Sequence, residues 1–183
     1  GEHPHDNMEI ISIPLEGDLE HKDSMGNTTV IRNGDIQVMS AGTGIYHSEY
    51  NRNKDATVKF LQIWVFPNKK NVTPRYDQIT MNPADRQNQF QQVLSPNPED
   101  AGVWIHQDAW FHLGKFDQDF SVDYSIKKEG NGLYVFILSG QFEVDGQVVQ
   151  TRDGLGIRQA SDVSFKALSP GAEVLLMEVP MQI

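Results

Sequence analysis

The chain has 183 residues, and its 38% hydrophobic content is enough for one large or two small globular cores. It has no cysteine, which excludes disulfides, thiolate catalysis and zinc–thiolate sites. With 15 basic against 25 acidic residues and a net charge of −10, it lacks the clustered Lys and Arg that neutralise phosphates, so we expect no direct binding to nucleic acid. We find neither a membrane-spanning apolar run nor a signal sequence, and therefore expect a cytoplasmic protein that does not bind a membrane.

From Met8 to Phe66 the sequence predicts short strands separated by turns. Strands are expected at 10–15, 19–23 and 28–32, and the Asn33-Gly34 pair that follows is typical of a two-residue hairpin. The segment Val58–Phe66 is almost continuously apolar, which predicts a central strand buried on both faces, ended by Pro67. Regularly spaced short strands favour a sandwich or barrel over alternating strands and helices.

Residues 68–102 differ from this pattern. They are rich in Pro, Asn and Gln and show little periodicity, which is typical of an inter-domain linker. A short helix is predicted from Pro83 to Gln89, because Asn82 can cap it and Pro83 suits the first helical position.

From Val103 the strand pattern resumes, and Asp145-Gly146 provides another hairpin turn. His106 and His112 have no partner at ligand spacing, so both are interpreted as structural. The expected strands are 103–106, 109–113, 120–126, 133–138, 141–144, 148–151, 155–158, 163–167 and 173–179.

Two pairs of side chains have the spacing of metal ligands. His3 and His5 are two residues apart, and so are His47 and Glu49, so each pair projects from one face of its own strand. Three imidazoles and one carboxylate suit a first-row transition metal better than calcium or magnesium, which prefer oxygen ligands. The sequence therefore predicts a metal site at His3, His5, His47 and Glu49.

These pairs lie in longer motifs. HPHDNME fits the HxHx3E pattern of the cupin barrels, and GIYHSEYN fits their Gx2Hx3N pattern. The segments HPHDNMEI, LEGDLEHKDSMGN, QVMSAGTGIYHSEYN and QIWVFP, in this order, resemble the N-terminal domain of the pirin family. The likeness continues more loosely through TPRYDQ, VLSPNPEDAG, IHQDA and DGLGI to EVLLMEVP, and so covers essentially the whole chain.

The resemblance implies an all-β bicupin of two jelly-roll-like β-barrel (double-stranded β-helix) domains. Residues 1–67 would form the metal-binding domain, 68–102 the linker, and 103–183 a cupin-like domain without metal. Family members carry further strands ahead of the HPH motif, whereas this chain begins two residues before it. We therefore expect the first barrel to lack its N-terminal strands here, with the chain a fragment or the strands a separate piece.

The resemblance also implies an activity. Pirin-like proteins are associated with quercetin 2,3-dioxygenase activity, which would use one divalent metal ion. Fe(II) is the expected metal, although imidazole and carboxylate accept other first-row metals. The substrates would be a flavonol-like aromatic compound and O2, with Glu49 as the general base. Two alternatives stay open: a metal-binding regulatory protein that acts through protein partners, as the nuclear mammalian member suggests, and a cupin enzyme with another small substrate.

Four further residues have competing interpretations. Glu9 completes the cupin pattern, but the family resemblance favours Glu49 as the ligand, which leaves Glu9 to orient an imidazole. His21 is expected to face solvent or to form a hydrogen bond rather than to be a fifth ligand. Trp64 is expected in the core, and Asn51 is expected to support the loop that follows it.

Overall fold

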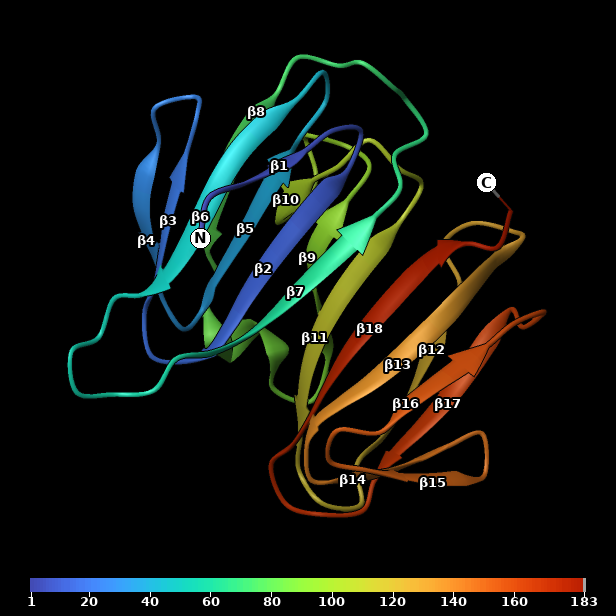
Figure 1. Cartoon of the computed structure of the whole chain (residues 1–183). Coiled ribbons are helices and arrows are strands. Elements are labelled where there is room, and N and C mark those ends of the chain that lie inside the picture. Colours follow the sequence, from blue (N-terminus) through green and yellow to red (C-terminus); the bar gives the residue numbers. More distant parts are fainter. Residues whose placement is uncertain (183) are drawn as a thin grey trace. The chain divides into compact units, whose positions relative to one another are not determined.

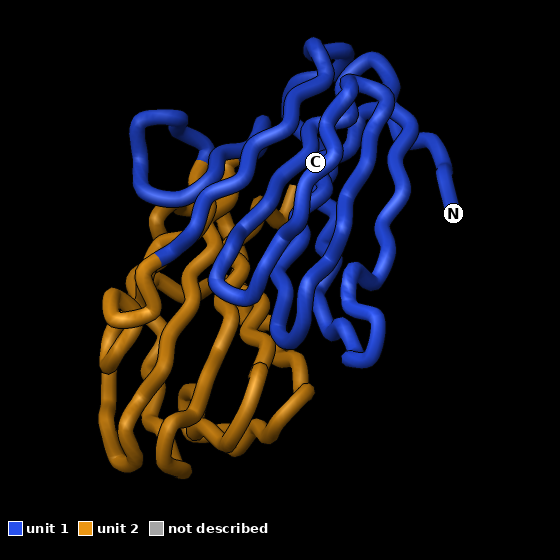
Figure 2. The backbone as a smooth tube through the Cα atoms, turned by 90° about the vertical axis from the view of Figure 1, so that its left-hand side faces the viewer, with its two compact units in different colours: residues 1–81, 96–107 blue, residues 82–95, 108–183 orange. Residues whose placement is uncertain are grey.

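The computed structural model describes residues 1–182, and its regular structure there is antiparallel strand apart from one 3₁₀ helix, η1. This confirms the predicted all-β class. The chain divides into two compact units, one formed by residues 1–81 and 96–107, the other by residues 82–95 and those from 108 onward (Figures 1 and 2). In the described part of the chain, no helix is long and apolar enough to cross a membrane.

The first unit contains two antiparallel sheets with a shared core. One sheet has the strand order β1-β6-β3-β4 and the other β7-β2-β5-β8. Ile10 and Met39 of the second sheet pack against Ala41 and Ile45, at the entry to β6 of the first. The strands are β1 (His3–His5), β2 (Glu9–Glu16), β3 (Leu19–Asp23), β4 (Thr28–Ile31), β5 (Asp35–Ser40), β6 (Ile45–Asn51), β7 (Lys59–Val65) and β8 (Arg75–Thr80), with β10 (Val103–Trp104) beside β5 and β8.

The apolar segment Val58–Phe66 forms an edge strand, so the prediction of a central strand buried on both faces is wrong. Among the described strands β7 pairs only with β2, and Trp64 is 55% exposed, which also overturns its assignment to the core. An apolar run cannot distinguish a buried strand from an edge strand whose aromatic side chains line a site. Two side chains of β7, Gln62 and Trp64, contact the predicted ligands Glu49 and His5 in this way.

Residues 68–102, predicted as a linker, contribute regular structure to each unit. β8 pairs with β5 in the first unit, and β9 (Phe90–Ser95) pairs with β11 in the second. Between them η1 spans Pro83–Arg86, and Asn82 caps it as predicted, with Oδ1 accepting from the Ala84 N–H at 3.2 Å. Sequence periodicity missed β8 because its inward side chains are polar: Gln78 and Thr80 both donate to Asp35.

The second unit has a larger apolar core, and its strands lie in the order β9-β11-β18-β13-β16 in one sheet and β12-β17-β14-β15 in another. A buried carboxylate, Glu178, accepts hydrogen bonds from Tyr124 Oη at 2.9 Å, from Asn131 Nδ2 at 2.8 Å and from the backbone of Lys127 and Lys128. The strands are β11 (Trp110–Phe116), β12 (Ser121–Ser125), β13 (Asn131–Ser139), β14 (Gln141–Val144), β15 (Gln147–Gln150), β16 (Gly154–Ile157), β17 (Asp162–Ala167) and β18 (Ala172–Pro180).

Candidate metal centre

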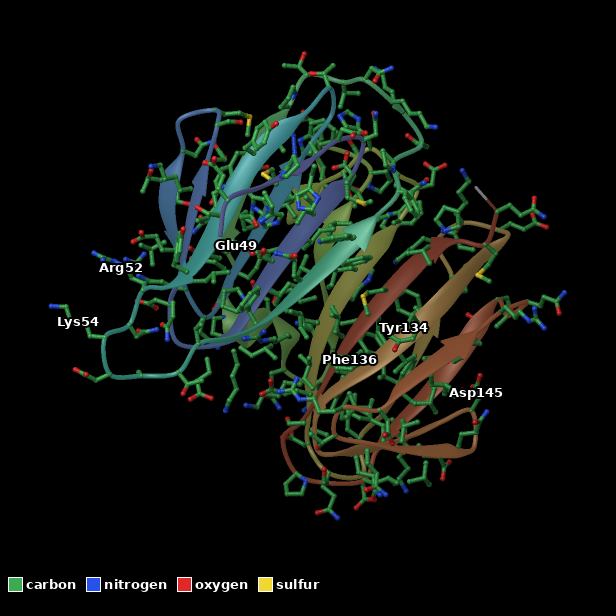
Figure 3. All side chains as sticks on the ribbon, in the orientation of Figure 1. Glu49, Arg52, Lys54, Tyr134, Phe136 and Asp145 are labelled. Atoms are coloured by element: carbon green, nitrogen blue, oxygen red, sulfur yellow. The ribbon has the colours of Figure 1, made fainter. Side chains whose placement is uncertain are left out.

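Strand register brings the predicted ligands to one face of the sheet β1-β6-β3-β4. His3 lies directly opposite His47, and His21 directly opposite Glu49. Directly paired residues of an antiparallel sheet share a face, as do residues two apart on one strand. His3, His5, His47 and Glu49 therefore all project from the face that carries His21. Figure 3 marks the position of Glu49 on β6.

The imidazoles are close enough to share an ion. Ring centroids are 4.5 Å apart for His3 and His47, 4.8 Å for His3 and His5, and 5.0 Å for His5 and His47. Candidate ligand atoms lie within 4.8 Å of one another in two groups, His3 with His5 and His47, and His21 with His47 and Glu49. His47 belongs to both groups and is the centre of the cluster.

Several ring nitrogens in the cluster are buried without a hydrogen-bond partner. Within the described residues these are Nε2 of His5, Nδ1 of His21 and both nitrogens of His47. A buried polar atom left unpaired costs about 1–3 kcal/mol, so four of them in one cluster call for an explanation. A metal ion accepts one lone pair from each neutral imidazole, and this donor set fits a first-row metal.

Two hydrogen bonds fix which nitrogen of a ring can face an ion. His3 Nδ1 lies 2.9 Å from the carbonyl oxygen of Gly1, which only accepts, so Nδ1 donates and Nε2 keeps its lone pair. His21 Nε2 likewise donates to Asp23 Oδ2 at 3.0 Å, which leaves the lone pair on Nδ1. A carboxylate or carbonyl behind the imidazole is the usual way in which proteins orient a metal-binding histidine.

The electrostatics of the cluster favour the ligating form of the central imidazole. Burial lowers the pKa of His47 to about 4, and the neighbouring rings of His3, His21 and His5 add to this effect. Burial also lowers the pKa of His5. Metal ligation requires neutral imidazole, so His47 is ready to bind an ion at neutral pH without losing a proton.

Glu49 is held on both sides by side chains that the sequence analysis did not identify. Ser12 Oγ donates to Oε1 at 3.0 Å, and the amide of Gln62 donates to Oε2. The indole N–H of Trp64 in turn donates to Gln62 Oε1 at 3.0 Å, while its ring packs edge-on against His5 with centroids 4.9 Å apart. Burial raises the pKa of Glu49. The apolar strand β7 thus lines the site through Gln62 and Trp64.

His21 is completely buried and hydrogen bonded, so the expected hydrogen bond is confirmed and the solvent-facing alternative is wrong. Its partner Asp23 also accepts from the backbone of Met25 and Asn27, at 2.9 and 3.1 Å. Burial alone would raise the pKa of Asp23, but the hydrogen bonds from His21 and Asn27 outweigh it and hold that pKa below its usual value. His21 was missed as a member of the cluster because only the register of β3 on β6 places it there.

Glu9 lies on the opposite face of its sheet, away from the cluster. Glu9 and the His3–His5 pair do not lie on one regular strand, because Asp6, Asn7 and Met8 separate β1 from β2 and Asn7 has a φ of 44°. Glu9 instead accepts a hydrogen bond from Ser40 Oγ at 2.7 Å. Burial raises the pKa of Glu9, and the Ser40 hydrogen bond, the charge of Arg75 and a backbone hydrogen bond from His106 partly offset this rise. Its position does not orient an imidazole of the cluster.

The remaining assignments concern loops and other histidines. Asn51 supports the turn after β6 as expected, with Oδ1 accepting from the Asn53 N–H and Nδ2 donating to the Ala56 carbonyl. His106 lies in the first unit and not with the later strands, and its ring packs against Trp104. His112 is buried beside Tyr124 in the second unit.

Comparison with known proteins identifies the family to which the chain is related. The pirin family model matches residues 1–65, and a model described as the quercetinase C-terminal cupin domain matches residues 92–179. A relative named quercetin 2,3-dioxygenase, from Escherichia coli (strain K12), is 37% identical over 98% of this chain and 76% of its own length. A pirin-like protein from Caulobacter vibrioides is 33% identical over 96% of this chain and 75% of its own length.

Among solved structures, the bacterial pirin YhhW from Escherichia coli in complex with nickel(II) superposes with a TM-score of 0.91. It is 36% identical, and the match covers 98% of this chain and 76% of that one. The pirin model and the quercetinase C-terminal cupin model together cover most of the chain, and the relatives named above are at least 33% identical over nearly all of it. The chain therefore belongs to the pirin family of cupin proteins.

Proposed function

We propose that the chain is a metal-dependent dioxygenase of the quercetinase type, with a single metal ion held by His3, His5, His47 and Glu49. The observation that carries the proposal is the set of buried, unpaired imidazole nitrogens around His47, beside a carboxylate. The relatives named quercetin 2,3-dioxygenase and the nickel(II) complex of a related pirin support it. Fe(II) is the proposed native metal, as the family resemblance implies, and the same donor set accepts other first-row metals.

The proposed substrates are a flavonol-like aromatic compound and O2. When bound, the metal supplies the Lewis acidity and redox activity that let an electron-rich enolate react with O2. The flavonol ring opens, both oxygen atoms enter the product, and carbon monoxide leaves.

The protein's own part is to remove one proton and to orient the substrate. Glu49 takes the proton of the flavonol 3-hydroxyl on a carboxylate oxygen and so acts as the general base. Ser12 and Gln62 hold the carboxylate in place for this transfer. The half-exposed indole of Trp64, packed against His5, offers a flat wall to an aromatic substrate.

The decisive experiment loads the protein with Fe(II) under anaerobic conditions and then measures quercetin consumption and carbon monoxide release in air. We expect turnover that depends on metal and is lost in His47→Ala. His106→Gln, a histidine of the same unit outside the cluster, should keep the activity. One-to-one metal binding without consumption of quercetin would refute the activity on this substrate and favour the regulatory alternative or another small substrate.

A second variant separates ligation from base catalysis. Glu49→Gln retains an oxygen ligand but no longer accepts a proton at neutral pH, so we expect kcat to fall about 100-fold and metal affinity to fall less. Turnover and metal binding are measured on the same preparations. Parental turnover in Glu49→Gln would remove Glu49 from the chemistry.

A further inference from the structure

The sheet β7-β2-β5-β8 also has a face that points away from the candidate metal centre. Side chains alternate along each strand, so Ser12 and Tyr76 point toward the metal centre, where they contact Glu49 and His21. Glu9, Ser40 and Arg75 point the other way, with Ser40 paired to both Glu9 and Arg75 in the register. This outer face carries a buried carboxylate, a cation and a pocket that the proposed chemistry does not use.

The pocket lies in the first unit and has a volume of about 600 Å³. This is within the range of about 300–1,000 Å³ that is typical of small-molecule sites. It shares no residue with the metal centre. Its walls are the loop of residues 69–75 together with Trp104 and His106.

The pocket concentrates positive charge in a chain whose net charge is −10. Lys69, Lys70 and Arg75 all line it. Two carboxylates offset part of this charge: Glu9 is buried near Arg75, and Asp77 Oδ2 lies 3.7 Å from Arg75 Nη2. Neither lysine forms an ion pair within the described part of the chain, so both ammonium groups remain available to an anion.

Arg75 is held rigidly at the wall of this pocket. Its guanidinium carbon lies 3.8 Å from the centroid of the Trp104 ring, and Nη1 and Nη2 donate to the Trp104 carbonyl at 3.2 and 2.7 Å. Nε is buried and has no hydrogen-bond partner among the described residues. An anion in the pocket does not reach this buried Nε, but each Nη group carries a second N–H beyond the one donated to Trp104. A guanidinium fixed on an indole face in this way is preorganised for an oxyanion beside a flat group.

We propose that this pocket binds a small organic anion, a carboxylate carried on a flat apolar body. Lys69 and Lys70 attract the carboxylate, and Arg75 supplies the fixed donor. The apolar body packs on Trp104, Val72 and Pro74, which line the same pocket. A cationic pocket without such walls would favour inorganic anions equally, so the aromatic and apolar lining sets the ligand class.

The loop that walls the pocket is bonded to both segments that lead to the metal ligands. Asn71 N–H donates to Asn7 Oδ1 at 2.7 Å, two residues after His5. Thr43 N–H donates to the Val72 carbonyl at 3.0 Å, just ahead of β6 and His47. An occupant of the pocket therefore contacts a loop joined to the backbone on either side of the cluster, and the amides of Asn7 and Thr43 report on its binding.

The test is a titration of the protein with 2-naphthoate, followed by amide NMR. We expect saturable shifts for residues 69–75 and 104–106, and smaller ones at Asn7 and Thr43. The double variant Lys69→Gln/Lys70→Gln should weaken binding on the order of tenfold, since each exposed charge contributes up to about a factor of five. Both side chains are exposed, so folding should be unaffected.

The matched control is Lys127→Gln/Lys128→Gln, an adjacent lysine pair in the second unit whose loss changes the net charge equally. It should leave the affinity unchanged. Neutral 2-naphthamide should bind more weakly than 2-naphthoate, and inorganic phosphate should not compete at matched concentration. The proposal would be overturned if saturable shifts at 69–75 were absent, or if both double lysine variants weakened binding equally. It would also be overturned if 2-naphthamide bound as tightly as 2-naphthoate, or if phosphate competed with 2-naphthoate.

Discussion

At the scale of single residues, Glu49 depends on a chain of donors that starts at the surface. The exposed indole of Trp64 donates to Gln62 Oε1 and so orients the amide, whose NH2 group then faces Glu49. A charge-assisted hydrogen bond of this kind is among the stronger ones in proteins. The position of the carboxylate is therefore set by a residue that an aromatic substrate would touch.

Replacing Gln62 tests this dependence. Gln62→Leu keeps the size of the side chain and removes the donor, so we expect kcat to fall about tenfold from the loss of a hydrogen bond to a charged group, worth about 1.5–3 kcal/mol. Trp64→Phe keeps an aromatic ring beside His5 and removes the donation to Gln62, which acts on Glu49 only indirectly, so its effect should be smaller. The measurements are kcat for quercetin and the metal dissociation constant by chelator competition.

Gln147→Leu, which replaces an exposed glutamine of the second unit, is the control and should match the parent. If Gln62→Leu shows parental kcat and metal affinity, the amide does not position Glu49.

Spacing along the sequence predicts some residues of this site and misses others. His3 with His5, and His47 with Glu49, could be proposed because each pair shares one face of a single strand. His21, Ser12 and Gln62 each stand alone in the sequence. His21 reaches the site through the register of β3 on β6, whereas Ser12 and Gln62 are paired on β2 and β7 and reach it from the other sheet. Single-strand alternation carries no information on register, so these three residues could not be assigned without the structure.

At the scale of elements, the turn ahead of β6 depends on a glycine. Gly42 has a φ of +51°, and a Cβ built on it would lie 2.0 Å from the Val72 carbonyl oxygen and 2.9 Å from its carbon. Both atoms belong to the backbone of the loop that Thr43 binds. Only glycine therefore allows β6 and the 69–75 loop to approach this closely.

Gly42→Ala should lower the free energy of unfolding by about 2–4 kcal/mol. An alanine in the left-handed conformation is strained by about 1–2 kcal/mol, and its Cβ would also clash with the Val72 carbonyl, which can move aside only if the backbone of the loop shifts. Urea unfolding measures this. Gly26→Ala is the control, since Gly26 has a φ of +95° but nothing within 4 Å of its built Cβ. It should lose only the strain, about 1–2 kcal/mol. Equal losses of stability in the two variants would show that contact with Val72 does not add to the cost of a side chain at position 42.

The ends of helices and strands are predicted best where capping or turn-forming residues mark them in the sequence. The helix start at Pro83 is confirmed because capping is a local property of Asn82. The break at Asp6-Asn7-Met8 was missed because no glycine or proline signals it, and Asn7 takes the left-handed conformation instead. That break decides which face of the sheet Glu9 occupies.

At the scale of the whole molecule, buried histidines make the stability of the chain depend on pH. Burial, aided by the charge of Lys127, lowers the pKa of His112 to about 3 from an ordinary value of 6.5. The unfolded chain takes up a proton below pH 6.5 that the folded chain refuses until about pH 3. The contribution of His112 to stability is therefore complete above pH 6.5 and is lost as the pH falls toward 3.

Other groups oppose or add to this dependence. Burial raises the pKa of Glu9 and Glu49, so as the pH falls the folded chain protonates these carboxyl groups before the unfolded chain does. Both groups therefore destabilise the folded chain less at lower pH. Burial lowers the pKa of His47 to about 4, which acts in the same direction as His112. A comparison of two proteins that differ only at position 112 cancels these contributions.

His112→Gln should flatten the acid side of the stability profile. One pKa unit corresponds to about 1.4 kcal/mol, so between pH 7 and pH 5 the parent should lose up to about 2 kcal/mol more than the variant. Urea unfolding measures the free energy of unfolding of the parent and of the variant. A chelator is present so that bound metal contributes to neither free energy. His106→Gln, at a less buried ring, should change the profile less. If His112→Gln keeps the parental loss between pH 7 and pH 5, the folded chain protonates His112 as readily as the unfolded one, and burial does not hold this ring neutral.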